Sequence, residues 1–149
     1  YYLGRNVILG DEMGLGKTAQ SVSLLQTLRS YEKLDGPFLI VAPLSTLSHW
    51  ERELDAWTDM YAVTYQGSAD SRRIIQQYDW CAPSPKAQPR YRFQVALCNF
   101  ETIVQDPEPL QRVRWQYMIV DEGHRLKNKN STTLSLMNDI KARRKLVLS

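Results

Sequence analysis

Cysteine is scarce in this chain of 149 residues, with only Cys81 and Cys98 present. Two thiols are too few for a disulfide framework, and their spacing matches no metal-ligand pattern, so we expect both to be free. Long apolar runs are also missing, since none approaches the ~18 residues that a membrane-spanning helix needs. The sequence therefore predicts no membrane anchor and no zinc site, and we expect a soluble protein of a reducing, intracellular compartment.

A strong charge of one sign is lacking as well. The formal net charge of +3 is too small to predict nucleic-acid binding by itself. Two clusters of cations, at 125–129 and 141–145, are typical of solvated faces. Hydrophobic residues make up 43% and charged residues 23% of the chain, which is the composition of an ordinary globular domain with its own core.

Short apolar runs alternate with stretches of helical spacing along the chain. The runs predict strands at 7–9, 38–42, 61–65, 93–97, 117–120 and 145–148, and the spacing predicts helices at 17–34, 45–57, 71–78 and 131–140. Strands and helices in this rhythm form right-handed crossovers on a parallel sheet. We therefore expect one three-layer α/β domain with a mostly parallel sheet. The proline-rich segment 81–90 is expected to be an exposed loop.

The helix expected at 45–57 has one apolar face, formed by Leu47, Trp50, Leu54 and Trp57. Because the two tryptophans share this face, we expect both to lie in the core rather than to stack on bases. Ser48 and Glu51 have the spacing of a capping box near the start of the helix.

The stretch "LGDEMGLGKT", residues 9–18, resembles a phosphate-binding loop in which Asp11 occupies the first glycine position. A glycine-rich turn between a buried strand and a helix directs free N–H groups at an anion. Lys17 would supply a cation to the outer phosphates, and Thr18 would offer a hydroxyl to Mg²⁺. A plain tight turn is the alternative interpretation. The candidate nucleotide-binding residues are Asp11, Glu12, Met13, Gly14, Leu15, Gly16, Lys17, Thr18 and Ala19.

A second motif is "YMIVDEGH", residues 117–124, in which four apolar residues precede two adjacent carboxylates. Ligands of open α/β sheets bind at the carboxyl edge of the strands. Asp121 is therefore a candidate ligand of Mg²⁺ together with Thr18, and Glu122 a candidate to polarise the attacking water. An acidic turn after a strand is the alternative. The candidate catalytic residues are Lys17, Asp121 and Glu122.

Four segments resemble motifs of one family. They are "DEMGLGKT", "VAPLSTLSHWERE", "VDEGHRLKN" and "KLVLS", which look like motifs I, Ia, II and the beginning of III in helicase-superfamily-2 ATPases of the SWI/SNF (sucrose-nonfermenting) type. In that family, aspartate is the normal residue at the position of Asp11. The segments "GPFLIVAPLSTLSHWERELDAW" and "VTYQGSADSRRII" look most like the chromodomain-helicase-DNA-binding branch. The resemblance implies that residues 1–149 are the first RecA-like P-loop lobe, truncated at both ends, with a second lobe missing.

The resemblance also implies an activity. We expect ATP and Mg²⁺ to be used in hydrolysis that drives movement along duplex DNA, with nucleosomes and their histones as the substrate and the nucleus as the location. Because the missing lobe carries arginines that face the γ-phosphate in this family, we expect the isolated fragment to be inactive. Two alternatives remain: a superfamily 2 helicase or repair translocase that does not remodel, or a non-catalytic nucleic-acid-binding module with a vestigial ATP site.

Two loops resemble those that follow the DNA phosphate backbone in this family. The first contains Pro43, Leu44, Ser45 and Thr46, whose hydroxyls and N–H groups can bind phosphate without reading sequence. Ser45 would serve equally well as a helix cap. The second contains Asn99, which can donate to a phosphate, whereas Cys98 stands where relatives carry a hydroxyl and is a poor donor.

A third segment follows the two carboxylates. Arg125, Lys127 and Asn128 match a part of the family pattern that links the ATP site to bound DNA. His124 is expected to be a coupling residue rather than a metal ligand, because no second ligand lies at a suitable spacing. A solvated basic turn is the alternative interpretation of this segment, above all for Lys129, which lies outside the matched positions.

Overall fold

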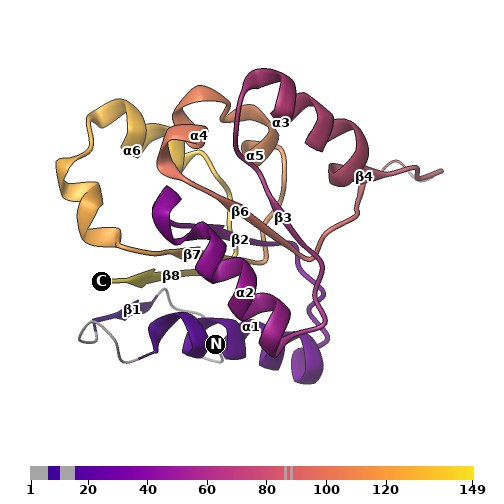
Figure 1. Ribbon diagram of the computed structural model, residues 1–149, viewed down its shortest axis with the longest axis horizontal. Coiled ribbons are helices and arrows are strands. Elements are labelled where there is room, and N and C mark those ends of the chain that lie inside the picture. The colour runs from indigo at the N-terminus through magenta and orange to yellow at the C-terminus, as the bar shows by residue number, and fades with distance from the viewer. Residues whose placement is uncertain (1–6, 11–15, 86, 88) are drawn as a thin grey trace.

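The computed structural model describes residues 7–10, 16–85, 87 and 89–149 (Figure 1). Six strands of this part of the chain form one sheet in the order β1–β8–β7–β2–β6–β3, and every pairing between them is parallel. The strands are β1 (Val7–Leu9), β2 (Phe38–Val41), β3 (Ala62–Thr64), β6 (Val95–Cys98), β7 (Tyr117–Val120) and β8 (Lys145–Leu148).

Helices cover both faces of this sheet (Figure 1). On one face lie α1 (Lys17–Glu32) and α2 (Leu47–Trp57), and on the other lie α3 (Ala69–Ile75), α4 (Phe100–Gln105), α5 (Glu108–Gln111) and α6 (Ser131–Asn138). Three shorter turns are η1 (Leu44–Thr46), the π-helical η2 (Gln76–Trp80) and η3 (Gly123–Asn128). The predicted three-layer α/β class is therefore confirmed. No helix in the described ranges has the length and apolar character needed to cross a membrane.

The three central strands are apolar throughout because both of their faces are covered. All residues of β2, β6 and β7 are buried. Along β2, Phe38 and Ile40 pack with the helices α1 and α2, whereas Leu39 and Val41 pack with the core beneath α4 and α6. This two-sided burial explains the continuous apolar runs from which the strands were predicted.

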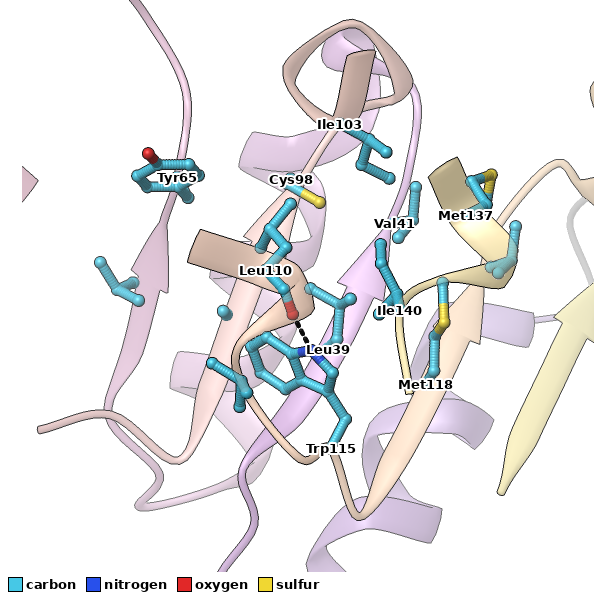
Figure 2. Close-up of a cluster of buried hydrophobic side chains, with 14 of the residues drawn as sticks. Leu39, Val41, Tyr65, Cys98, Ile103, Leu110, Trp115, Met118, Met137 and Ile140 are labelled. Carbon is cyan, nitrogen blue, oxygen red and sulfur yellow. Dashed lines mark hydrogen bonds between the residues drawn. The ribbon is translucent and has the colours of Figure 1, made fainter. Parts of the chain in front are cut away.

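Trp115 lies in the core beneath α4, α5 and α6 and contacts residues from two parts of the chain there (Figure 2). Its ring lies 6.0 Å from that of Phe93 in a stacked arrangement. Its indole Nε1 donates to the carbonyl oxygen of Leu110 at 2.8 Å, and this bond is buried. The bond satisfies a carbonyl at the end of the short helix α5, so Trp115 fixes the position of a helix that is too short to be stable alone.

Several helix and loop predictions need correction. The helices α4 and α5 were not predicted, because each is short and lacks a clear period. The segment 81–90 is not simply a loop, since β4 (Cys81–Ala82) pairs antiparallel with β5 (Arg90–Tyr91). The pairing uses residues at the two ends of the segment, so most of the prolines stay outside the hydrogen-bonded positions.

The start and end of α2 also differ from expectation. Ser48 lies inside the helix, whose N-cap is Thr46 without a side-chain hydrogen bond, so neither Ser48 nor Ser45 is the cap. Glu51 instead accepts a hydrogen bond from the Thr64 hydroxyl of the neighbouring β3. Trp50 is fully buried as predicted, whereas Trp57 is 62% exposed. The prediction for Trp57 was wrong because the last turn of α2 extends past the edge of the core.

Replacing Trp115 by Phe tests the role of the buried indole N–H. The ring can still stack on Phe93, but the Leu110 carbonyl loses its donor. An unsatisfied buried carbonyl costs about 1–3 kcal/mol, so the free energy of unfolding in urea should fall by about that amount. Trp57→Phe is the control, since its indole N–H donates to the side chain of Glu53 at the surface rather than to a buried group. Equal stabilities of the two variants would contradict this account of Trp115.

Candidate nucleotide site and adjoining groove

The strand order places three chain segments next to each other at one edge of the sheet. The carboxyl ends of β1, β8 and β7 are neighbours, so the segments that follow them meet there. They enclose a cleft of about 400 Å³, a volume within the usual range for small-molecule sites. The described residues that line it are Gly16, Lys17, Thr18, Ala19, His49, Glu53, Asp121, Glu122, His124 and Ser149.

The first of these segments is the start of α1. Gly16 precedes the helix with φ 77°, a left-handed conformation that glycine adopts without strain. The first turn of α1 then presents Lys17 and Thr18 to the cleft, and its free N–H groups favour an anion there. The Lys17 ammonium donates to the carbonyl oxygen of Ser149. Ser149 directly follows β8 and is the third of the segments that meet at the cleft. The predicted residues Asp11, Glu12, Met13, Gly14 and Leu15 lie outside the described residues.

The second segment brings the Asp121 carboxylate to the cleft, with both oxygens held. Its Oδ2 accepts from Trp50 Nε1 at 3.0 Å, and its Oδ1 accepts from the backbone N–H of Glu122 at 2.9 Å. The backbone N–H of Asp121 donates to Val41 O at 2.7 Å. A carboxylate oxygen can accept more than one hydrogen bond, so both oxygens of this cleft-lining side chain can still bind a further group.

This donor set fits Mg²⁺. A hydroxyl from Thr18 and a carboxylate from Asp121 are oxygen ligands, which Mg²⁺ prefers, and Mg²⁺ is commonly held by one or two protein groups together with substrate phosphates. Among the described residues, no group of three or more histidines, cysteines or carboxylates could hold a metal ion alone. His124 belongs to no such group in this part of the chain.

Glu122 adopts an unusual backbone conformation. Its φ of 55° is left-handed, which is strained for a residue other than glycine. Its Oε2 lies 3.2 Å from His124 Nε2 and 3.5 Å from Arg125 Nε. Backbone strain of this kind occurs often at functional sites, where surrounding structure maintains it. The conformation turns the chain sharply after β7 and brings the Glu122 side chain to the cleft.

Gly123 explains why the turn is so tight. A Cβ atom at this position would lie 2.2 Å from Val147 Cγ1 of β8. Such a distance is impossible without movement of one segment. The absence of a side chain at Gly123 therefore lets η3 pack directly against β8, which lies between β1 and β7 in the sheet.

A second hollow adjoins the cleft at the same edge of the sheet. It measures about 700 Å³ and lies beyond the neighbouring carboxyl ends of β2 and β6. We call it the groove. Five predicted DNA-binding residues line it, namely Pro43, Leu44, Ser45, Asn99 and Arg125, whereas Thr46, Lys127 and Asn128 do not. Sequence reasoning missed the other lining residues, which are Gln66, Gly67, Phe100, Glu101, Thr102, Gln105 and Lys129.

Asn99 has a structural role within the groove. Its Oδ1 accepts from the Thr102 backbone N–H at 2.8 Å and from the Thr102 hydroxyl at 2.7 Å, which makes it the N-cap of α4. The preference of asparagine for N-caps is the signal that identifies this role. Cys98 is fully buried in the core and does not line the groove, and burial raises the pKa of its thiol. The Lys129 ammonium lies 5.3 Å from the centre of the Phe100 ring.

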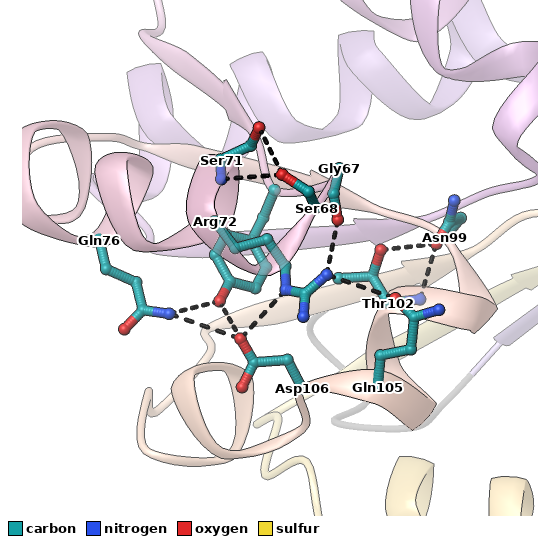
Figure 3. A network of polar contacts seen from close by, with 10 residues as sticks. Gly67, Ser68, Ser71, Arg72, Gln76, Asn99, Thr102, Gln105 and Asp106 are labelled. Carbon is teal, nitrogen blue, oxygen red and sulfur yellow. Dashed lines mark hydrogen bonds and ion pairs between the residues drawn. The ribbon is translucent and has the colours of Figure 1, made fainter.

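A polar network supports one wall of the groove (Figure 3). Asp106 accepts hydrogen bonds from the Tyr65 hydroxyl, from Arg72 Nε at 3.3 Å and from Gln76 Nε2 at 3.5 Å. Arg72 also donates to the carbonyl oxygen of Gly67 at 2.6 Å. Burial and the Asp106 carboxylate both raise the pKa of Tyr65, so its hydroxyl remains protonated. The network fixes α3 and the Gly67 loop relative to α4.

Comparison with known proteins places this architecture in a family. The family model of the SNF2-related domain matches residues 2–149. The chain is 42% identical over 155 residues to chromodomain-helicase-DNA-binding protein 8 of Homo sapiens, and 41% identical over 152 residues to that of Danio rerio. It is also 41% identical over 152 residues to chromodomain-helicase-DNA-binding protein 6 of Mus musculus. Each match covers 100% of this chain but only 6% of the relative's length.

Two solved structures resemble the fold. The Sulfolobus solfataricus SWI2/SNF2 ATPase core in complex with dsDNA superposes with a TM-score of 0.81 at 24% identity, covering 99% of this chain and 28% of that chain. The same core domain in a second structure gives a TM-score of 0.74 at 23% identity, covering 99% and 27%.

The sheet, the cleft and these matches define an α/β domain of the RecA-like type. The chain belongs to the SNF2-related domain family. The predicted similarity to the chromodomain-helicase-DNA-binding branch is confirmed by the relatives named above.

Gly123→Ala tests the packing of η3 against β8. The added methyl group collides with Val147 Cγ1, and overpacking of this kind costs about 1–3 kcal/mol. We expect the free energy of unfolding to fall by that amount, and the second substitution Val147→Ala to restore part of it by removing the colliding atom. Gly10→Ala is the control, because a Cβ there would meet no atom of the described residues within 4 Å. Failure of Val147→Ala to rescue would show that the clash is not the cause.

Proposed function

We propose that this chain is the ATP-binding lobe of a chromatin-remodelling ATPase, which uses hydrolysis to move along duplex DNA in the nucleus. The observation that carries the proposal is the meeting of Lys17, Asp121 and Glu122 in one cleft, although more than 100 residues separate the first from the other two. A cation, a metal-binding carboxylate and a second carboxylate are the groups that phosphoryl transfer to water requires.

Each group has a separate role in this proposal. Lys17 and the first N–H groups of α1 bind the outer phosphates, and the candidate residues Asp11–Leu15 complete the loop. Thr18 and Asp121 hold Mg²⁺, which when bound neutralises negative charge on the phosphate oxygens. Glu122 orients and polarises the water that attacks the γ-phosphate. His124 and Arg125 contact the Glu122 carboxylate, so they are placed to couple its position to η3 and to the groove.

The groove is the proposed site for duplex DNA. Its backbone and hydroxyl groups suit phosphate contacts that carry no base information. The Ser45 loop, Asn99 and Arg125 line it, while Lys127 and Asn128 extend the surface along η3. Support comes from the Sulfolobus solfataricus core, whose structure contains dsDNA, and from relatives named as chromodomain-helicase-DNA-binding proteins. Nucleosomes are accordingly the proposed substrate.

Residues 1–149 are proposed to be the first of two RecA-like lobes. The chain spans about 6% of the length of the curated relatives it matches. We propose that a second lobe of the full-length protein closes on the cleft and supplies arginines to the γ-phosphate. Arginine groups of this kind contribute roughly 10³–10⁵ in rate.

Lys17→Ala in the full-length protein tests the nucleotide site. The substitution removes a cation from the phosphates and no residue of the core, so duplex-stimulated ATP turnover should fall by about 100-fold or more while the folded state persists. Lys141→Ala is the control, because it removes an equal charge from an exposed position outside the cleft.

Three outcomes of this measurement decide the assignment. Unchanged turnover in Lys17→Ala would contradict the assignment of the cleft. Absence of turnover in the unaltered protein would favour a binding module with a vestigial site. Stronger stimulation by single-stranded than by duplex nucleic acid would favour a strand-separating helicase.

Lys129→Gln tests the groove. If the Lys129 ammonium binds a DNA phosphate, its removal should weaken duplex binding about equally for different sequences. The slope of log affinity against log salt concentration should also fall by about 0.9, because one fewer counterion is released. Lys33→Gln, at the far end of α1, is the charge-matched control. An unchanged salt slope in Lys129→Gln would exclude this contact, and a loss limited to certain sequences would indicate base recognition.

A further inference from the structure

We propose that Trp50 is a positioning residue that orients the Asp121 carboxylate and links the groove to the nucleotide cleft. The proposal deepens the proposed function and rests on it. It starts from one juxtaposition: the indole N–H of a fully buried tryptophan on α2 donates to a carboxylate oxygen that comes 71 residues later, at the end of β7.

The hydrogen bond has the properties expected of an orienting contact. The Nε1–Oδ2 distance is 3.0 Å, and the ring of Trp50 is 0% exposed, so the donor cannot turn elsewhere. The other oxygen of Asp121 is fixed by the N–H of Glu122. These two donors therefore define the plane of the carboxylate. A carboxylate that must present free oxygen lone pairs toward Mg²⁺ benefits from such a fixed plane.

The helix that carries Trp50 is held firmly. Leu47 and Leu54 are buried in the same cluster as Leu25 and Leu28 of α1. Glu51 accepts a hydrogen bond from Thr64 of β3. The helix α2 thus packs against the helix that presents Lys17 and Thr18.

The same helix begins at the groove. Leu44 and Ser45 of η1 line the groove, and η1 leads directly into α2 at Leu47. On α2, His49 and Glu53 line the nucleotide cleft on either side of Trp50 in the sequence. A displacement of η1 by a ligand in the groove would therefore be carried by α2 to the indole of Trp50 and so to the Asp121 carboxylate.

This arrangement predicts a specific defect when the donor is lost. Without the Trp50 N–H, the Asp121 carboxylate can rotate about its Cβ–Cγ bond. Loss of a group that orients a metal ligand typically weakens metal affinity 10–100-fold. The concentration of Mg²⁺ that supports nucleotide binding should rise by that factor. Nucleotide binding without Mg²⁺ should stay the same, because Lys17 and α1 are untouched.

The experiment replaces Trp50 in the full-length protein by benzothienylalanine, in which sulfur takes the place of the indole N–H. This change keeps the size of the ring, so a role in packing alone predicts no effect. The probe is a fluorescent ATP analogue, whose binding is titrated with Mg²⁺ in the presence and absence of a DNA duplex. The matched control is the same replacement at Trp115, which is also buried but donates to the Leu110 carbonyl in the opposite core.

We expect the Trp50 replacement to raise the Mg²⁺ requirement 10–100-fold and to abolish the effect of the duplex on that requirement, while the Trp115 replacement changes neither. A Trp50 replacement that titrates like the unaltered protein would overturn the proposal. Equal shifts for both replacements would also overturn it, because they would indicate general destabilisation.

Lys17→Ala separates this proposal from the proposed function. If the unaltered protein and Lys17→Ala both bind the analogue without any dependence on Mg²⁺, the nucleotide site itself is wrong and the role of Trp50 fails with it. If Lys17→Ala abolishes Mg²⁺-dependent binding while the Trp50 replacement has no effect, only the role of Trp50 is refuted.

Discussion

Parallel strand pairing is the constraint on which the rest of this structure depends. Because all six strands run in the same direction, every segment that follows a strand emerges at one edge of the sheet. The order β1–β8–β7–β2–β6–β3 then divides this edge into two halves. The ends of β1, β8 and β7 form the proposed nucleotide cleft, and the ends of β2 and β6 border the groove. The start of α1, which is proposed to bind phosphate, therefore meets an acidic turn that is far away in the sequence.

The boundary between the two halves lies between β7 and β2, and the polar contacts concentrate there. Asp121 donates its N–H to Val41 of β2 and accepts the indole N–H of Trp50, which belongs to the helix that follows β2. Arg125 lines the groove and lies 3.5 Å from the Glu122 carboxylate. Two independent connections thus cross from the cleft to the groove. Such connections can transmit a change only if a ligand at either site binds more tightly to one position of the shared elements than to another.

The sequence predicted well those features that depend on local pattern. The strands Tyr117–Val120 and Lys145–Leu148 have the predicted bounds because their apolar runs end abruptly. It predicted less well the features that depend on distant partners. The network around Asp106 joins side chains that are 30 or more residues apart, and Lys129 lines the groove because of where η3 folds. The exposure of Trp57 and the capping role of Asn99 depend on where a helix begins and ends, which periodicity locates poorly.

The central claim is that the cleft and the groove are two coupled sites of one lobe. The most direct test measures thermodynamic linkage in the full-length Glu122→Gln variant, in which loss of the carboxylate charge should prevent hydrolysis during the measurement. Binding free energies of coupled sites change reciprocally. The account predicts that ATP with Mg²⁺ changes the affinity for a DNA duplex, and that the duplex changes the affinity for ATP by the same factor. Affinities for ATP and for the duplex that are independent of one another would contradict it.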